Sequence, residues 1–149
     1  MIRRAQIEDI HQIQVLINQF AKQELMLPRS LSRLYECLRD FWVCQQNNQI
    51  AGCCALHIIW QDLGEIRSLA VKKPRQGKGI GRQLVNAALD EARGLGLKSI
   101  FTLTYIPDYF KGFGFHRISK EKLPHKIWAE CINCPKFPDC KEVALIKKL

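Results

Sequence analysis

The sequence lacks any apolar run close to the roughly 20 residues that a helix needs to cross a bilayer. Residues 1–6 lead into an acidic and polar helical pattern instead of the apolar core of a secretory signal. Internal repeats, low-complexity tracts and linkers are also absent from the sequence. These absences argue against a membrane span, a secretory leader and a second domain, so we expect one cytoplasmic domain over residues 1–149.

The sequence is short of acidic residues, with 14 Asp and Glu against 23 Lys and Arg, which leaves a net charge of +9. Such a balance favours an anionic partner: nucleic acid, an acidic membrane or a polyanionic cofactor. The basic residues are scattered and form no stripe interleaved with aromatic residues. We therefore expect no nucleic-acid or membrane partner, and the charge points to a small polyanion.

The cysteines do not form a disulfide framework, because the seven residues are odd in number and several lie in apolar patterns. Cys131 and Cys134 have the spacing of half a zinc site, Cys140 offers a third ligand, and His125 or Asp139 could complete it. No second C-x-x-C follows. For the segment at about 123–142 we therefore favour a loop that contains Cys and Pro and covers the active site, and not a metal centre. The other histidines show no ligand spacing, which predicts structural or surface roles.

Hydrophobic periodicity predicts a mixed α/β chain. Helical spacing predicts helices from residue 8, after Ser30 as N-cap, from residue 80 to about 94, and at 108–112. Alternating or continuous apolar runs predict strands at 2–5, 41–45, 50–60, 65–71, 99–104, from 113, and at 143–146. Asn47 and Asn48 indicate a hairpin turn, and Gly52 marks a bulge or a close backbone approach.

A glycine-rich segment separates the strand at 65–71 from the helix that begins at residue 80. A strand, a glycine loop and a helix N-terminus together make an anion site, because backbone N–H groups and the helix dipole converge there. The loop lacks the Gly-Lys-Ser/Thr ending of nucleotide-binding loops and the G-x-G-x-x-G spacing of dinucleotide sites. Its glycines are surrounded by polar side chains, namely Arg75, Gln76, Lys78 and Arg82.

Two segments resemble the GCN5-related N-acetyltransferases (GNAT). Residues 76–81 are similar to that family's Q/R-x-x-G-x-G/A signature, and residues 110–115 are similar to its (Y/F)-x-x-x-G-F segment. The resemblance implies a mixed, mostly antiparallel sheet of about six to seven strands flanked by helices, with acetyl-CoA as cofactor. The pyrophosphate would bind at the loop residues Gln76, Gly77, Lys78, Gly79, Ile80, Gly81 and Arg82. The pantetheine arm would pair with Leu69, Ala70 and Val71, which would offer an N–H to the thioester oxygen.

Within this superfamily the chain resembles the acetyltransferase domain of bacterial N-acetylglutamate synthases, in a short, single-domain form. The similarity is carried by residues 27–30, 64–71 and 100–104. It implies direct acetyl transfer to the α-amino group of L-glutamate, or of a similar acidic amino acid, in a ternary complex. Arginine biosynthesis would be the pathway, and a homodimer is left open.

The resemblance implies which residues accept and donate the protons of the reaction. Glu65 would be the base that receives the amine proton, and Thr104 would donate to the leaving thiolate or position it. Tyr105 and Tyr109 remain alternatives for the acid, because the family's tyrosine position holds a phenylalanine here.

A dicarboxylate substrate needs fixed cations to bind it, and the planar guanidinium of arginine matches the geometry of a carboxylate. Arg29 and Ser30 match the family's Arg-Ser segment, and Arg67 lies two residues after Glu65. Strand alternation predicts that Glu65, Arg67 and Leu69 share one face.

Two other functions remain possible from the sequence. One is acetyl transfer to another small amine or to a protein amino group, and the other is that of a non-catalytic module that binds CoA or senses a metal.

Overall fold

The computed structural model describes residues 1–124 and 142–149. The cysteine pair Cys131 and Cys134, with Cys140, His125 and Asp139, lies outside the described residues, as does most of the predicted loop at 123–142. The metal alternative for that segment therefore stays untested.

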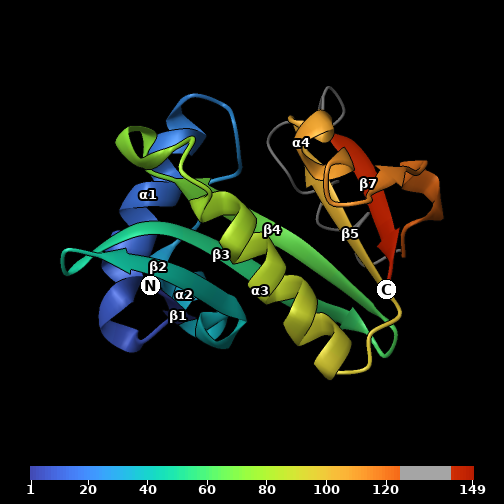
Figure 1. Ribbon diagram of the computed structural model, residues 1–149, viewed down its shortest axis with the longest axis horizontal. Coiled ribbons are helices and arrows are strands. Elements are labelled where there is room, and N and C mark those ends of the chain that lie inside the picture. Colours follow the sequence, from blue (N-terminus) through green and yellow to red (C-terminus); the bar gives the residue numbers. More distant parts are fainter. Residues whose placement is uncertain (125–141) are drawn as a thin grey trace.

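A mixed sheet forms the centre of the molecule (Figure 1). The described residues contribute seven strands: β1 (Ile2–Arg4), β2 (Phe41–Gln46), β3 (Gln49–Trp60), β4 (Leu63–Val71), β5 (Ser99–Thr104), β6 (His116–Arg117) and β7 (Val143–Lys148). They are ordered β1-β2-β3-β4-β5-β7-β6, and every neighbouring pair is antiparallel except β4 and β5. The predicted mostly antiparallel sheet is confirmed.

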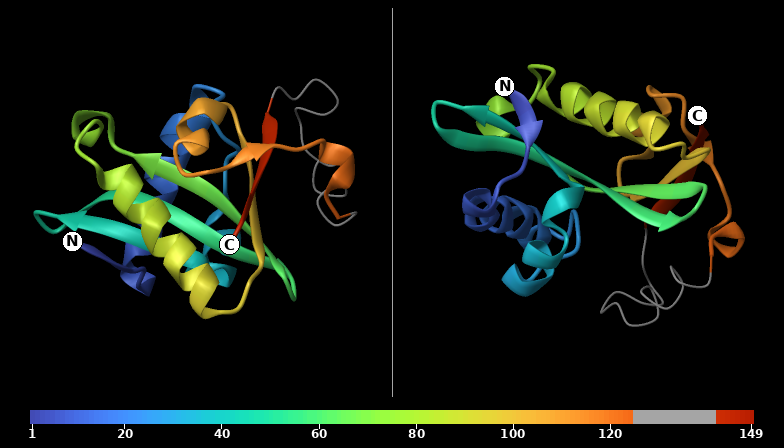
Figure 2. Two further views of the ribbon diagram at one scale, coloured as in Figure 1. Left: turned by 45° about the vertical axis from the view of Figure 1, so that its right-hand side comes forward. Right: turned by 90° about the horizontal axis from the view of Figure 1, so that it is seen from below.

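Helices cover both faces of this sheet. Figure 2 shows α1 (Ile10–Lys22) and α2 (Leu31–Glu36) on one side and α3 (Ile80–Gly94) on the other. A short helix, α4 (Pro107–Lys111), follows β5, and 3-10 turns lie at η1 (Ile7–Asp9), η2 (Leu38–Asp40), η3 (Lys73–Arg75) and η4 (Lys120–Lys122). We call the two sides the α1/α2 face and the α3 face.

The apolar spacing of the two long helices explains how they pack. Ile10, Ile13 and Ile17 of α1 are fully buried in a cluster on the α1/α2 face. Leu84 and Val85 of α3 are fully buried in a second cluster on the α3 face. Each such side chain contributes about 1.5–3 kcal/mol when it leaves water, so these two clusters hold the helices against the sheet.

Local signals in the sequence set most element ends correctly. The Ser30 side chain accepts a hydrogen bond from the backbone N–H of Arg33 at 3.1 Å, which confirms it as the N-cap of α2. Asn47 and Asn48 form the hairpin turn with φ of 52° and 62°. The strand expected from residue 113 is wrong at its start, because Phe113 and Phe115 donate backbone hydrogen bonds back to Phe110. Because of this turn, β6 begins only at His116.

Gly52 lies at a close approach of β3 to α3. A Cβ at this position would lie 3.1 Å from both the Ala70 carbonyl oxygen and Leu84 Cδ1, and 3.2 Å from Ile80 Cγ2. The register against β2 also shifts here, so that Ala51 is one extra residue in β3. Both interpretations of Gly52, close approach and bulge, are therefore confirmed.

Replacing Gly52 by valine should lower the free energy of unfolding by about 1–3 kcal/mol, because the added methyl groups overpack the contact with α3. Chemical denaturation measures this change. Gly94→Ala is the control, since a Cβ at Gly94 meets nothing within 4 Å. Equal stability of Gly52→Val and the native protein would contradict the close approach.

Candidate active site

The parallel strands β4 and β5 pair only at one end. Their register covers Leu63 with Ser99, Gly64 with Ile100, and Glu65 with Phe101. Beyond this point the strands diverge (Figure 1), and the Thr102 hydroxyl donates to the Ile66 carbonyl oxygen at 2.8 Å. The backbone of β4 after Ile66 therefore borders an opening in the sheet.

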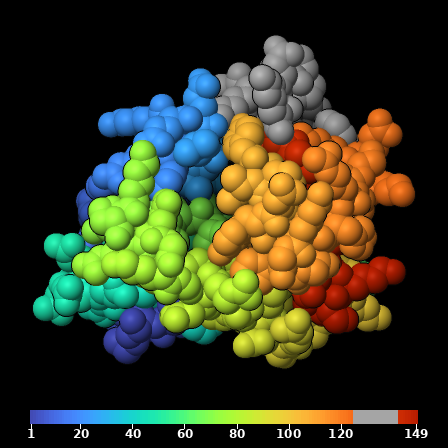
Figure 3. Space-filling model, turned by 45° about the horizontal axis from the view of Figure 1, so that its top comes forward, coloured from blue at the N-terminus to red at the C-terminus, as the bar shows by residue number. Residues whose placement is uncertain are grey.

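A cavity of about 970 Å³ occupies this opening. It is bordered by β4, the segment at 75–82, the end of β5, the start of α4 and the segment that follows α1. Figure 3 shows the hollow between the yellow-green segment that leads into α3 and the orange segment that contains α4. Its volume lies at the upper end of the range of about 300–1,000 Å³ usual for ligand sites, so it has room for a large cofactor.

Most of the residues singled out from the sequence line this cavity. They are Arg29, Glu65, Arg67, Leu69, Ala70, Val71, Gln76, Gly77, Gly79, Ile80, Gly81, Arg82 and Thr104. Tyr105 and Tyr109 also line it, whereas Ser30 and Lys78 are not among the lining residues. The Ser30 hydroxyl is instead engaged in capping α2.

The sequence analysis did not assign three of the apolar lining residues to the site. Leu25, Met26 and Leu27 lie in the segment after α1 and line the cavity together with Phe20 of α1. The apolar run just before Pro28, in a segment that periodicity assigns to neither helix, is the signal that points to these three residues.

The glycine loop brings the N-terminus of α3 to the cavity. Gly77 and Gly79 have φ of 78° and 85°, a left-handed conformation that glycine adopts without strain, and Gly79 is the N-cap of α3. The Gln76 side-chain amide donates to the Val71 carbonyl oxygen at 3.0 Å and ties the loop to the end of β4. The first-turn N–H groups of a helix have no partner within the helix, which makes this end suitable for a phosphate.

The predicted common face of Glu65, Arg67 and Leu69 is wrong for Leu69. Ala55 of β3 is opposite Arg67 while Cys53 is opposite Ala70, so β4 carries an extra residue between them. Ser68 has a φ of 56° at this bulge. Leu69 therefore packs with the cluster on the α3 face, whereas Arg67 borders a small hollow with α2 residues.

Glu65 and Arg67 form an ion pair on the α1/α2 face. Their nearest oxygen and nitrogen are 3.5 Å apart, and the two side chains are only 9% and 10% exposed. Arg29 reaches the same cavity from the segment before α2. Its backbone is fixed to α1, because its N–H donates to Asn18 Oδ1 at 3.3 Å and its carbonyl accepts from Gln14 at 3.2 Å. Two arginines and one carboxylate thus line the same cavity.

The three candidate proton donors come from the end of β5 and from the residues that follow it, which include Tyr105 and, in α4, Tyr109. Thr104 is buried, and its hydroxyl oxygen accepts from the Ile106 N–H at 2.9 Å, so the O–H remains to be donated. Burial raises the pKa of the Tyr109 hydroxyl, although the nearby Arg82 guanidinium lowers it in part. Tyr109 therefore holds its proton at neutral pH. Its hydroxyl lies against Gly81, where a Cβ would be only 2.5 Å away.

No helix within 1–124 or 142–149 combines the length and the apolar character that a membrane span requires.

Comparison with known proteins agrees with this geometry. The model of the acetyltransferase (GNAT) family matches residues 7–117. An uncharacterized N-acetyltransferase of Chlorobaculum tepidum is 40% identical over 148 residues, which cover 99% of this chain and 96% of that protein. The amino-acid acetyltransferase of Mycobacterium tuberculosis is 35% identical over 133 residues, or 87% of this chain and 76% of that protein.

A solved structure shows the same fold. The N-acetylglutamate synthase of Neisseria gonorrhoeae, complexed with coenzyme A and N-acetyl-glutamate, has a TM-score of 0.92 and 29% identity to this chain. The match covers all of this chain and 35% of that one. The chain belongs to the acetyltransferase (GNAT) family and is an N-acetyltransferase that uses acetyl-CoA.

Proposed function

We propose that this enzyme acetylates the α-amino group of L-glutamate. The observation that carries the proposal is the presence of Arg29 and Arg67 in one cavity with Glu65. Two guanidinium groups match the two carboxylates of glutamate, and arginine binds carboxylates in a planar, bidentate manner. The Mycobacterium amino-acid acetyltransferase and the Neisseria synthase with bound N-acetyl-glutamate support the same acceptor. Such an enzyme would serve arginine biosynthesis in the cytoplasm.

The cofactor would bind along the opening between β4 and β5. Its pyrophosphate fits the N-terminus of α3 and the glycine loop, where Arg75 and Arg82 add positive charge. Its pantetheine arm fits against Leu69, Ala70 and Val71, whose strand has left β5 at this point. The thioester would then lie near the bulge at Ser68, between the glycine loop and the two arginines, Arg29 and Arg67.

The chemistry is a direct transfer in a ternary complex. The amine nitrogen attacks the thioester carbon, the new C–N bond forms, and the C–S bond breaks. Glu65 accepts the amine proton, directly or through a water molecule. A backbone N–H at 69–71 stabilises the oxyanion that forms on the thioester oxygen. Thr104 donates to the leaving thiolate or positions it, with Tyr105 and Tyr109 as the other donors.

Thiol release from acetyl-CoA across a panel of amino acids tests the proposed acceptor. We expect release that depends on L-glutamate, with the mass of the product raised by one acetyl group. Release with another small amine or a protein N-terminus, and none with glutamate, would show that glutamate is not the acceptor. Absence of release with every amine, despite binding of CoA, would favour a non-catalytic module.

Arg29→Ala should raise the KM for glutamate by about 10- to 100-fold, because a hydrogen bond between charged groups contributes about 1.5–3 kcal/mol. The KM for acetyl-CoA should stay close to the native value. Steady-state kinetics with each substrate varied in turn measures the two constants. Arg93→Ala is the control, since Arg93 lies near the far end of α3 and pairs with Asp90. An equal rise in both KM values would remove Arg29 from the carboxylate site.

Glu65→Gln should lower kcat by about 10²- to 10⁴-fold, the usual contribution of a general base. The amide has nearly the same shape, so the buried site keeps its packing and circular dichroism should be unchanged. Raising the pH deprotonates more of the free amine and should restore part of the rate. Glu121→Gln, a change at an exposed carboxylate, serves as control. A native kcat in Glu65→Gln would exclude the base role.

Thr104→Val should lower kcat, whereas Thr104→Ser should retain most of it because the hydroxyl remains. Tyr109→Phe removes the phenol whose pKa burial raises, and it should change kcat less than Thr104→Val. The three variants are compared at saturating glutamate and acetyl-CoA. A larger loss in Tyr109→Phe than in Thr104→Val would transfer the donor role to Tyr109.

A further inference from the structure

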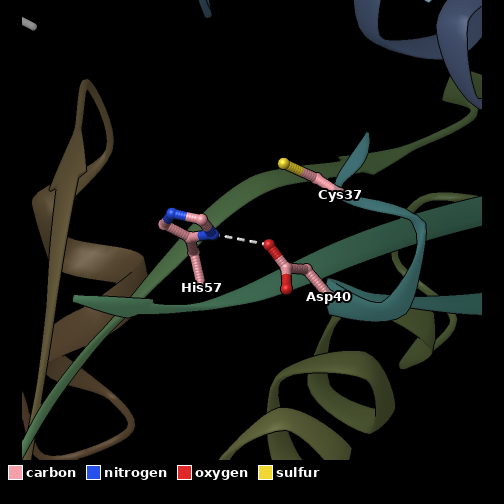
Figure 4. Close-up of side chains that lie close together, drawn as sticks. All are labelled: Cys37, Asp40 and His57. Atoms are coloured by element: carbon pink, nitrogen blue, oxygen red, sulfur yellow. Dashed lines mark hydrogen bonds and ion pairs between the residues drawn. The ribbon is translucent and has the colours of Figure 1, made fainter. Parts of the chain in front are cut away.

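Three side chains with metal-binding atoms converge on the α1/α2 face. Cys37 follows α2, Asp40 ends η2, and His57 lies on β3. One ligand atom from each lies within 4.8 Å of the other two. Figure 4 shows the imidazole of His57 pointing toward the Asp40 carboxylate, with the Cys37 sulfur beside them. No spacing in the sequence indicated this group, because His57 is 17 residues from Asp40.

The donor set suits a zinc ion. Zinc binds thiolate sulfur, imidazole nitrogen and carboxylate oxygen, and a thiolate with a carboxylate supplies two negative charges to balance Zn²⁺. Nδ1 of His57 now donates to Oδ2 of Asp40 at 2.6 Å. With zinc–ligand bonds of about 2.0–2.2 Å, the two atoms would separate to roughly 3.3 Å in a tetrahedral site. Side-chain rotations that move these atoms by less than about 1 Å would achieve this separation. The Cys37 sulfur, which lies within 4.8 Å of both atoms, would move closer to about 3.6 Å.

The position of the group makes it accessible to an ion. The side chains of His57 and Asp40 are 25% and 21% exposed, and Cys37 is half-buried. Cys53 and Cys54, by contrast, are fully buried, and burial raises the pKa of the Cys53 thiol to about 12. Among the cysteines in the described part of the chain, Cys37 therefore combines an accessible thiol with neighbouring nitrogen and oxygen ligands.

We propose that Cys37, Asp40 and His57 form a zinc site with an open fourth coordination position. The ion would link the segment after α2 to the second half of β3. Cys37 and Asp40 also border a small hollow shared with Arg29 and Arg67. The zinc site therefore lies beside the part of the active-site cavity that holds the two arginines, although zinc binding itself does not depend on the identity of the acceptor.

Zinc titration by calorimetry tests this site directly. The background is the whole chain with Cys131, Cys134 and Cys140 replaced by serine, which removes the three thiols outside the described residues, after dialysis against a chelator. We expect one zinc ion per chain and a rise in Tm with zinc. Cys37→Ser and His57→Gln should each weaken binding at least about tenfold and abolish most of the Tm rise, because each removes a direct ligand. His116→Gln, at an exposed histidine on β6, is the matched control.

Cobalt serves as a second measurement, because a thiolate ligand gives Co²⁺ a sulfur-to-metal charge-transfer band. The band should form in the background protein and be absent in Cys37→Ser, while Asp40→Asn, the closest shape match to the native side chain, weakens it. If the background variant does not fold, the comparison uses the chain with its other cysteines intact, where Cys37→Ser and His57→Gln should each lose one equivalent of bound metal. An unchanged metal stoichiometry in both Cys37→Ser and His57→Gln, or no stoichiometric binding in any variant, would overturn the proposal and leave His57 and Asp40 as a structural hydrogen bond.

Discussion

The short parallel pairing of β4 and β5 is the constraint on which the rest of the site depends. After Glu65 the two strands separate, and backbone groups that would form a ladder need other partners, since buried polar groups are costly to leave unpaired. Thr102 satisfies one of them, the Ile66 carbonyl oxygen. The remaining part of β4 faces the cavity, where an extended ligand can hydrogen-bond to it. The glycine loop follows directly, so the same strand leads from the proposed position of the acyl group to the proposed position of the phosphates.

The bulge at Ser68 divides β4 into two parts whose side chains lie on different faces of the sheet. Before it, Glu65 and Arg67 share the α1/α2 face and form their ion pair. After it, Leu69 turns to the α3 face and lies on the side of the loop and helix. A regular strand would have placed all three side chains on one face. The shift by one residue separates the proposed acceptor groups from the proposed cofactor groups within a few residues of chain.

The sequence predicts those features that depend on neighbouring residues. The helical spacing around Ile13 and Leu84, the cap at Ser30 and the asparagine turn each follow from local preferences, and all are confirmed. The bulge could not be predicted, because a serine with positive φ has no sequence signal and its cause lies in the register with β3. The convergence of His57 on Asp40 and the divergence of β5 from β4 are likewise set by contacts between distant segments.

A structure of the enzyme with coenzyme A and N-acetyl-L-glutamate tests the central claim most directly. The account predicts pantetheine density between β4 and β5, the pyrophosphate at the N-terminus of α3, and the product carboxylates within hydrogen-bonding distance of Arg29 and Arg67. The acetyl group would then lie next to the bulge at Ser68, with its nitrogen on the Glu65 side. A cofactor bound outside the opening, or a product whose carboxylates contact neither arginine, would contradict the account.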